Sequence, residues 1–207
     1  MPLSAPRPAV WQAGGTMEES RAVPDAPADP GDAPDASVTP APGGRRRRRL
    51  PLLVAATAAL VVLLDQTAKA WAVRALGGGE TIEVVDGLLE LRLFRNPGAA
   101  FSFATGTTWV FTLVATVVSV VIVRISRRLG SRGWALALGL LLGGAVGNLL
   151  DRLFRTPGFP QGHVVDFIDL PRLFVFNLAD ASITCAAVLI ALLGLRGVGV
   201  DGTRVQA

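Results

Sequence analysis

The sequence contains a single cysteine, Cys185, and a single histidine, His163. One cysteine excludes a disulfide within the chain. Zinc sites draw mainly on cysteine and histidine, so these two residues supply too few ligands, and one histidine poorly equips a Ser-His-Asp triad. We therefore expect a protein that uses no metal and no other cofactor.

Charged residues are also scarce. They make up only 17% of the chain, whereas soluble domains carry about a quarter. Hydrophobic residues reach 51%, and the mean hydropathy is +0.48. The net charge is +4, but the arginines cluster beside apolar runs, which is typical of membrane orientation and not of nucleic-acid binding. The composition thus indicates an integral membrane protein.

The chain divides into three parts. Residues 1–49 form a Pro/Ala/Asp-rich tail that we expect to be disordered and cytoplasmic, with no apolar stretch near Met1 that would make a signal peptide. This tail ends in the run Arg45–Arg49, which could bind nucleic acid or anionic lipid, although its place before an apolar run favours a topology anchor. Residues 50–196 are the predicted membrane domain, and residues 197–207 a short cytoplasmic tail.

Four apolar segments approach the length of about 20 residues that a helix needs to cross a bilayer. They run over Leu50–Ala75, Thr107–Val123, Gly133–Leu150 and Phe174–Leu195. Between the first two, Thr81–Val85 and Leu89–Leu93 alternate in part around Asp86-Gly87, which predicts a β-hairpin. We expect an all-α membrane protein with four transmembrane helices and a small extracytoplasmic β-sheet or hairpin. The segment Leu153–Val165, with its prolines and glycines, should be a loop.

The distribution of arginine predicts the orientation. Arginines precede the first helix and fill the link between the second and third, and such residues favour the cytoplasmic side. Both termini should therefore be cytoplasmic in a multi-pass protein. The opposite loops also carry arginine, so the bias is partial. The arginines of the link are Arg124, Arg127, Arg128 and Arg132.

The acidic residues fall at one depth in this arrangement. At 1.5 Å per residue, Asp65 lies about 22 Å along the first helix and Asp151 about 27 Å along the third. Asp180 lies about 9 Å into the fourth helix, which enters from outside. Asp166 is expected in the outer loop before it. All four should lie near the outer boundary of a hydrocarbon core about 30 Å thick.

Two kinds of acidic residue can be distinguished. Asp65 and Lys69 are four residues apart on one helix face and should pair, and Asp151 is expected to pair with Arg152; both pairs could serve packing alone. Asp166 and Asp180 have no cation at helical spacing. Two close carboxylates would share one proton, as in an aspartic protease. From the residues alone, a peptidase, a proton or ion pathway and a non-catalytic scaffold all remain open.

Five short motifs then narrow the choice, because their order along the chain resembles that of the lipoprotein signal peptidase (signal peptidase II) family. The segment Asp65-Gln66-Thr67-Ala68-Lys69 is similar to the D-Q-x-x-K element of that family. Asn96-Pro97-Gly98-Ala99-Ala100-Phe101 is similar to N-x-G-A-A-F, and Gly147-Asn148-Leu149-Leu150-Asp151-Arg152 to G-N-x-x-D-R. Val164-Val165-Asp166-Phe167 and Phe176-Asn177-Leu178-Ala179-Asp180 resemble V-x-D-F and F-N-x-A-D. The resemblance covers about residues 50–195.

This resemblance implies an aspartic endopeptidase of the bacterial inner membrane that removes signal peptides from diacylglyceryl-modified prolipoproteins, cutting before the lipidated cysteine. Its partners would be these substrates and membrane lipids, with no nucleic acid, and we expect a monomer. Carried over by motif, Asp166 and Asp180 are the catalytic pair. The residues that would bind substrate or support the pair are Asp65, Lys69, Asn96, Gly98, Asn148, Asp151, Arg152 and Asn177.

Two residues stand outside the motifs. His163 lies close to Asp166 in the sequence and could tune its pKa, but an ordinary solvated loop residue is the simpler interpretation. Cys185 lies on an apolar stretch of the fourth segment, where we expect a small core residue.

Overall fold

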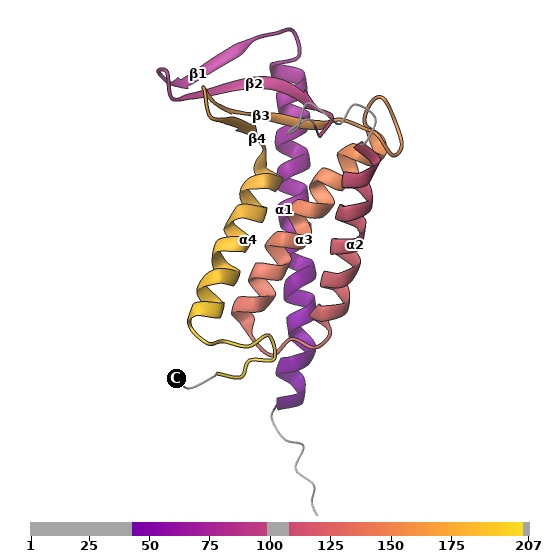
Figure 1. The fold of residues 1–207 in the computed structure, drawn as a ribbon, viewed down its shortest axis with the longest axis vertical. Helices are drawn as coiled ribbons and strands as arrows, with labels where there is room; N and C mark the ends of the chain where they lie inside the picture. The colour runs from indigo at the N-terminus through magenta and orange to yellow at the C-terminus, as the bar shows by residue number, and fades with distance from the viewer. Residues whose placement is uncertain (1–42, 99–107, 205–207) are drawn as a thin grey trace, which may run out of the picture. The chain divides into compact units, whose positions relative to one another are not determined.

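The computed structural model describes residues 43–98 and 108–204 of the chain, with side chains from Arg49 onward. The expectation for the tail before residue 43 lies outside these ranges, as do Ala99, Ala100 and Phe101 of the second motif. Within them the chain forms four helices and one small sheet (Figure 1).

All four predicted helices are present: α1 (Gly43–Ala75), α2 (Thr108–Ser126), α3 (Arg132–Phe154) and α4 (Leu178–Leu195). Each of the four is long and apolar enough to cross a membrane, where the span in α1 is taken from Arg49 to Ala75. The predicted start of the fourth helix at Phe174 is wrong. Asn177 has an extended backbone, and its side chain accepts a hydrogen bond from the Asp180 N–H. In return, the Asp180 carboxylate accepts a hydrogen bond from the Asn177 N–H. This capping box begins the helix at Leu178.

A line of glycines brings α3 close to α1. A Cβ added at Gly143 would lie 2.6 Å from the Cβ of Val61, and one added at Gly147 would lie 2.7 Å from the Asp65 carboxylate. Small residues repeated every four positions let helix backbones approach closely in membrane proteins. The approach matters for the polar residues, because it sets Asp65 and Lys69 of α1 beside α3. The glycines on this face are Gly139, Gly143 and Gly147.

The sheet is larger than the predicted hairpin. Its antiparallel strands, in the order β1-β2-β3-β4, are β1 (Thr81–Val85), β2 (Leu89–Asn96), β3 (Val164–Leu170) and β4 (Phe174–Phe176). The hairpin formed by β1 and β2 is confirmed. The predicted loop Leu153–Val165 is wrong at both ends, because α3 continues to Phe154 and β3 begins at Val164. Asp166, expected in a loop, lies on β3, which is buried on both faces and so lacks the alternating pattern of a half-exposed strand.

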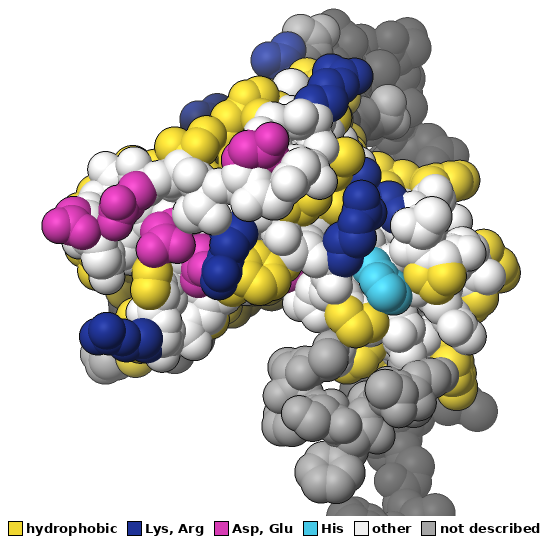
Figure 2. All heavy atoms as spheres, turned by 90° about the horizontal axis from the view of Figure 1, so that it is seen from above, with side chains coloured by type: hydrophobic (Ala, Val, Ile, Leu, Met, Phe, Trp, Pro, Cys, Tyr) yellow, Lys and Arg dark blue, Asp and Glu magenta, His cyan; other side chains and the backbone are white. Residues whose placement is uncertain are grey.

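The sheet lies across one end of the helix bundle, and the described part of the C-terminal segment lies at the other end (Figure 1). Val165 and Phe167 of β3 pack against Ala72 and Leu76 at the end of α1. Charged side chains of both signs gather on the sheet end (Figure 2), whereas the flanks of the helices expose many large apolar residues. This division is typical of a bundle set in lipid with a polar cap in water.

Candidate active site

The predicted site residues meet where the sheet covers the helices. Asp65 and Lys69 come from α1, Asn148, Asp151 and Arg152 from α3, and Asp166 from β3. Asn177 caps α4, and Asp180 is the third residue of that helix. Because α4 starts four residues later than predicted, Asp180 lies only about 3 Å along it. The side chains of Asp65, Lys69, Asp151 and Asn177 are almost completely buried.

Asp166 receives hydrogen bonds on both carboxylate oxygens. The side-chain amide of Asn177 donates to Oδ1 at 2.6 Å, and that of Asn96 donates to Oδ2 at 2.9 Å. Asn96 is held in turn by the Gly98 N–H, which donates to its Oδ1 at 2.8 Å. Gly98 has a φ of +98°, which glycine adopts without strain, and an added Cβ would meet the ring of Phe111. The turn after β2 therefore requires glycine.

Asp180 is bound from two other directions. The side-chain amide of Asn148 donates to Oδ1 at 2.8 Å, and the backbone N–H of Asn177 donates to Oδ2 at 3.3 Å. Asn177 thus contacts both carboxylates, through its side chain and its backbone. Since one residue spans the two, Asp166 and Asp180 belong to a single hydrogen-bonded group.

A second cluster lies behind this group and is built on Lys69. Its Nζ is 2.9 Å from Asp65, 3.0 Å from Asp151 and 2.9 Å from Oδ1 of Asn148. The predicted pair of Asp65 and Lys69 is confirmed. Burying an ammonium ion is costly unless several acceptors surround it, and here three do. Asn148 joins the two clusters, because it accepts from Lys69 and donates to Asp180.

The predicted pairing of Asp151 with Arg152 is wrong. Adjacent helix residues point in different directions, and Asp151 instead pairs with Lys69 and with Nε of Arg155. The guanidinium of Arg152 lies 5.2 Å from the centre of the Phe111 ring. Within the described ranges, its Nη1 is buried without a hydrogen-bond partner. Arg152 is therefore a buried cation close to both site carboxylates, whose charges act on it.

Sequence reasoning missed two members of the network. The amide nitrogen of Gln66 lies 3.1 Å from Asp65 and 3.2 Å from Asp151. Arg155 contacts Asp151 one helical turn away. Both had a signal in the sequence, because Gln66 is part of the first motif and Arg155 follows Asp151 at the i,i+4 spacing of a helical ion pair.

The two residues outside the motifs behave differently from each other. Between described residues, no hydrogen bond or ion pair joins the His163 side chain to Asp166, and its ring is partly buried. Cys185 is exposed, so the expectation of a core residue is wrong. It lies on the outward face of α4 because the buried positions nearby are Ser182 and Ala186.

The environment of Asp166 favours a proton. Burial raises the pKa of its carboxyl above the ordinary value, and the nearby charge of Asp180 acts in the same direction. The amides of Asn96 and Asn177 oppose this by stabilising the charged form. A carboxyl whose pKa is raised, placed in one hydrogen-bonded group with a second carboxyl, suits the acid and base roles of such a pair. In the described part of the chain, no three His, Cys, Asp or Glu side chains are placed to hold a metal ion.

Known proteins match the chain over this same region. The family profile described as "Signal peptidase (SPase) II" matches residues 57–196. The chain belongs to the signal peptidase II family. A lipoprotein signal peptidase of Rhodococcus jostii is 52% identical over 145 residues, which cover 70% of this chain and 73% of that protein. One of Streptomyces coelicolor is 50% identical over 141 residues, covering 68% and 69%.

A solved structure resembles the fold as well. A bacterial membrane enzyme determined by the in meso method aligns with a TM-score of 0.61 and 29% sequence identity, covering 69% of this chain and 92% of that one. The sequence resemblance to signal peptidase II is therefore confirmed, and the chain is a multi-pass membrane peptidase. All of its predicted site residues converge at the sheet end of the bundle.

Proposed function

We propose that the chain is an aspartic endopeptidase that removes signal peptides from diacylglyceryl-modified prolipoproteins by cutting before the lipidated cysteine. Its membership of the signal peptidase II family and its relatives, which are named lipoprotein signal peptidases, support this activity. Asp166 and Asp180 are the proposed catalytic pair. The observation that carries this choice is the bridging contact of Asn177, which donates to both carboxylates.

The proposed reaction needs one proton shared by the pair. The ionised carboxylate takes a proton from water, and the oxygen of that water attacks the scissile carbonyl carbon. The protonated carboxyl gives its proton to the carbonyl oxygen. When the tetrahedral intermediate collapses, one of its hydroxyl groups returns a proton to the carboxylate that had donated one, the C–N bond breaks, and the amine nitrogen takes the proton that came from water. The products are the signal peptide with a new carboxyl end and the lipoprotein with a free amine.

The remaining site residues have supporting roles in this proposal. Asn96, Asn148 and Asn177 direct amide N–H groups at the two carboxylates and so fix their orientation. Lys69, with Asp65 and Asp151, anchors Asn148 from behind. Arg152 carries a buried donor without a partner among the described residues, and a substrate carbonyl would satisfy it.

The proposed orientation places the sheet outside the cell membrane and both termini in the cytoplasm. The arginines between α2 and α3 lie at the end of the bundle away from the sheet, which the positive-inside rule assigns to the cytoplasm. The substrate's lipid would then anchor it at the outer surface, beside the site. Fusing a periplasm-dependent enzyme to the C-terminus tests this, since an active fusion contradicts the orientation.

A proton or ion pathway is less well supported. Such a pathway needs ionisable groups spread across the membrane. Among the residues that the structure describes, the buried ionisable groups are Asp65, Lys69, Asp151, Arg152, Asp166 and Asp169, and all belong to the sheet or to the network beneath it. The buried polar residues elsewhere in the helices are Thr108, Thr112, Ser126 and Ser182. They carry no charge to relay.

The decisive experiment expresses the chain in cells that lack their own lipoprotein signal peptidase, with a tagged lipidated reporter followed by gel shift and mass. We expect the wild type to release the signal peptide. Asp166→Asn and Asp180→Asn should each lower the rate by at least about 100-fold, because each removes a proton-transfer group. Membrane levels are compared by blot.

Asp169→Asn is the matched control. Asp169 is a buried carboxylate on the same strand as Asp166, but it pairs with Arg92 at 2.8 Å. The same change of acid to amide should leave cleavage within about a factor of three, because the partner is half exposed and the ion pair adds little. If the wild type leaves the precursor intact, the proposed activity is wrong. If it cuts and either site variant cuts equally well, the choice of catalytic residues is wrong.

A further inference from the structure

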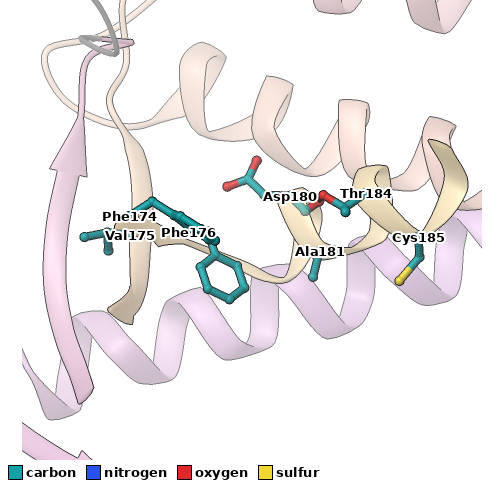
Figure 3. Close-up of a pocket in the computed structure, with 7 residues that line it drawn as sticks. All are labelled: Phe174, Val175, Phe176, Asp180, Ala181, Thr184 and Cys185. Carbon is teal, nitrogen blue, oxygen red and sulfur yellow. Dashed lines mark hydrogen bonds between the residues drawn. The ribbon is translucent and has the colours of Figure 1, made fainter. Parts of the chain in front are cut away.

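A cavity of about 530 Å³ lies beside Asp180, between β4 and the first turns of α4. Its volume is within the range of small-molecule sites. Figure 3 shows β4 forming one wall and α4 the other, with Asp180 at the end nearest β4 and Cys185 farthest along the helix. The lining residues are Phe174, Val175, Phe176, Asp180, Ala181, Thr184 and Cys185.

The lining offers little to a polar ligand. Asp180 is its one charged residue, and both carboxylate oxygens already accept hydrogen bonds from Asn148 and Asn177. The hydroxyl of Thr184 donates to the backbone carbonyl of Asp180 at 2.9 Å, so it is satisfied within its own helix. What remains is aromatic, aliphatic and thiol surface. A peptide segment would bury backbone amides here with few partners, which is costly.

The α4 wall continues into the membrane-facing surface of the helix. Thr184, Cys185, Val188 and Leu192 are all exposed, and their spacing places them on one face. Because α4 is long and apolar enough to span a bilayer, this face contacts hydrocarbon. An apolar chain could therefore pass between the bilayer and the cavity without crossing a polar barrier. Cys185 lies about 7.5 Å along the axis from Asp180, so the cavity extends toward the bilayer core.

We propose that this cavity binds an acyl chain of the lipid-modified residue of the substrate and so places the adjoining peptide bond at Asp180. The proposal rests on the proposed peptidase function, and it names the part of the enzyme that recognises the lipid. The continuity of the cavity with both Asp180 and the lipid-facing surface selects this occupant. A peptide side chain would need only the first of these connections.

The single cysteine makes a direct test available, because a thiol reagent modifies the folded protein at Cys185 alone. Purified enzyme is treated with methyl or decyl methanethiosulfonate, and labelling is checked by mass. The methyl adduct, assayed with a dipalmitoylglyceryl substrate, is the size control, because it places only a small group at the same position. The decyl adduct should raise KM for that substrate by at least about tenfold, since it competes for buried apolar contacts. Cys185→Ser treated in the same way should be unaffected.

A second arm varies the lipid and the cavity by mutation. Ala181→Phe should reduce the preference for a dipalmitoyl over a dihexanoyl substrate by about tenfold, because a ring then occupies the space. Val188→Phe, on the same exposed face but outside the cavity, should leave the preference unchanged. Detergent unfolding temperatures identify any variant that is misfolded, and the adduct experiment does not depend on folding of a variant.

The outcomes distinguish a failure of the proposed lipid site from a failure of the proposed peptidase function. Failure of the untreated wild type to cut the lipidated substrate would contradict the peptidase function itself. If the wild type cuts and the decyl adduct cuts dipalmitoyl substrate with an unchanged KM, the lipid site is wrong while the function stands. An equal loss on long-chain and short-chain substrates would also overturn it, because the adduct would then be obstructing the peptide and not the lipid.

Discussion

Lys69 donates to Oδ1 of Asn148 at 2.9 Å, and this contact connects the buried ion cluster to the proposed catalytic pair. With its oxygen bound to Lys69, Asn148 turns its amide nitrogen toward Asp180, to which it donates at 2.8 Å. An amide held at one end cannot flip without losing both contacts. The lysine therefore determines which way the amide points at Asp180, although it does not touch that carboxylate.

The first prediction concerns Lys69→Met. The change leaves Asp65 and Asp151 buried without their shared cation, and breaking a buried ion pair costs about 3–5 kcal/mol. We expect a large fall in the unfolding temperature measured in detergent. Adding Asp65→Asn should recover part of it, because one stranded charge is removed. Arg74→Met, at an exposed position of the same helix, should change little, and an equal effect at both sites would contradict the role of Lys69.

The second prediction separates the two tasks of Asn177, which caps α4 and also donates to Asp166. Serine is as good a cap as asparagine, but it is too short to replace the amide donor, whereas alanine loses both. We expect Asn177→Ser to keep near-normal stability and to lower kcat by about 100-fold. Asn177→Ala should lose the same activity and a further ~1 kcal/mol of stability. Full activity of the serine variant would show that the amide contact is dispensable.

The third prediction concerns pH. The amide of Asn96 stabilises the charged form of Asp166, whose pKa is already raised by burial. Asn96→Ala removes that donor, so the pKa of Asp166 should rise further. The limb of the kcat/KM pH profile that reports the titration of Asp166 should move to higher pH. The other limb should not move to lower pH. A downward shift of either limb would contradict this account of the hydrogen bond.

The raised pKa of Asp166 also has a consequence for stability. The folded protein holds this proton at pH values where the unfolded chain has lost it. The group therefore contributes stability that is present below its ordinary pKa and is lost as pH rises through the folded value. Asp166→Asn, which cannot titrate, should flatten that part of the stability curve when unfolding is followed between acid and neutral pH.

The fourth prediction tests the contact of α1 with α3. Gly143→Ala would place a Cβ 2.6 Å from the Cβ of Val61, so one helix must move away. Overpacking of this kind costs about 1–3 kcal/mol, and we expect lower unfolding temperature together with reduced cleavage. Gly194→Ala on α4 meets nothing within 4 Å and should be neutral or slightly stabilising. Similar losses at both glycines would contradict a specific role for close helix approach.

Much of the site was visible in the sequence because its residues lie at short fixed spacings. Asp65 and Lys69 lie on one helix face, which depends only on local geometry, whereas the start of α4 at Leu178 and its cap at Asn177 were not predicted. The pairing of Asp151 was predicted wrongly for the opposite reason. Its partner Lys69 is on another helix. The glycines of α3 bring the two helices together, but the sequence does not show which helix packs against them.

The sequence by itself determined the membrane class and the number of helices, since hydropathy encodes them, and the resemblance of its motifs to the signal peptidase II family indicated the polar residues of the site. Only the tertiary structure decided that β3 pairs with β2, which sets Asn96 against Asp166 across 70 positions of the chain. It also decided that Asn177 bridges the two carboxylates and that a cavity opens beside Asp180. Contacts between distant segments depend on how whole elements pack, and no local pattern records that packing.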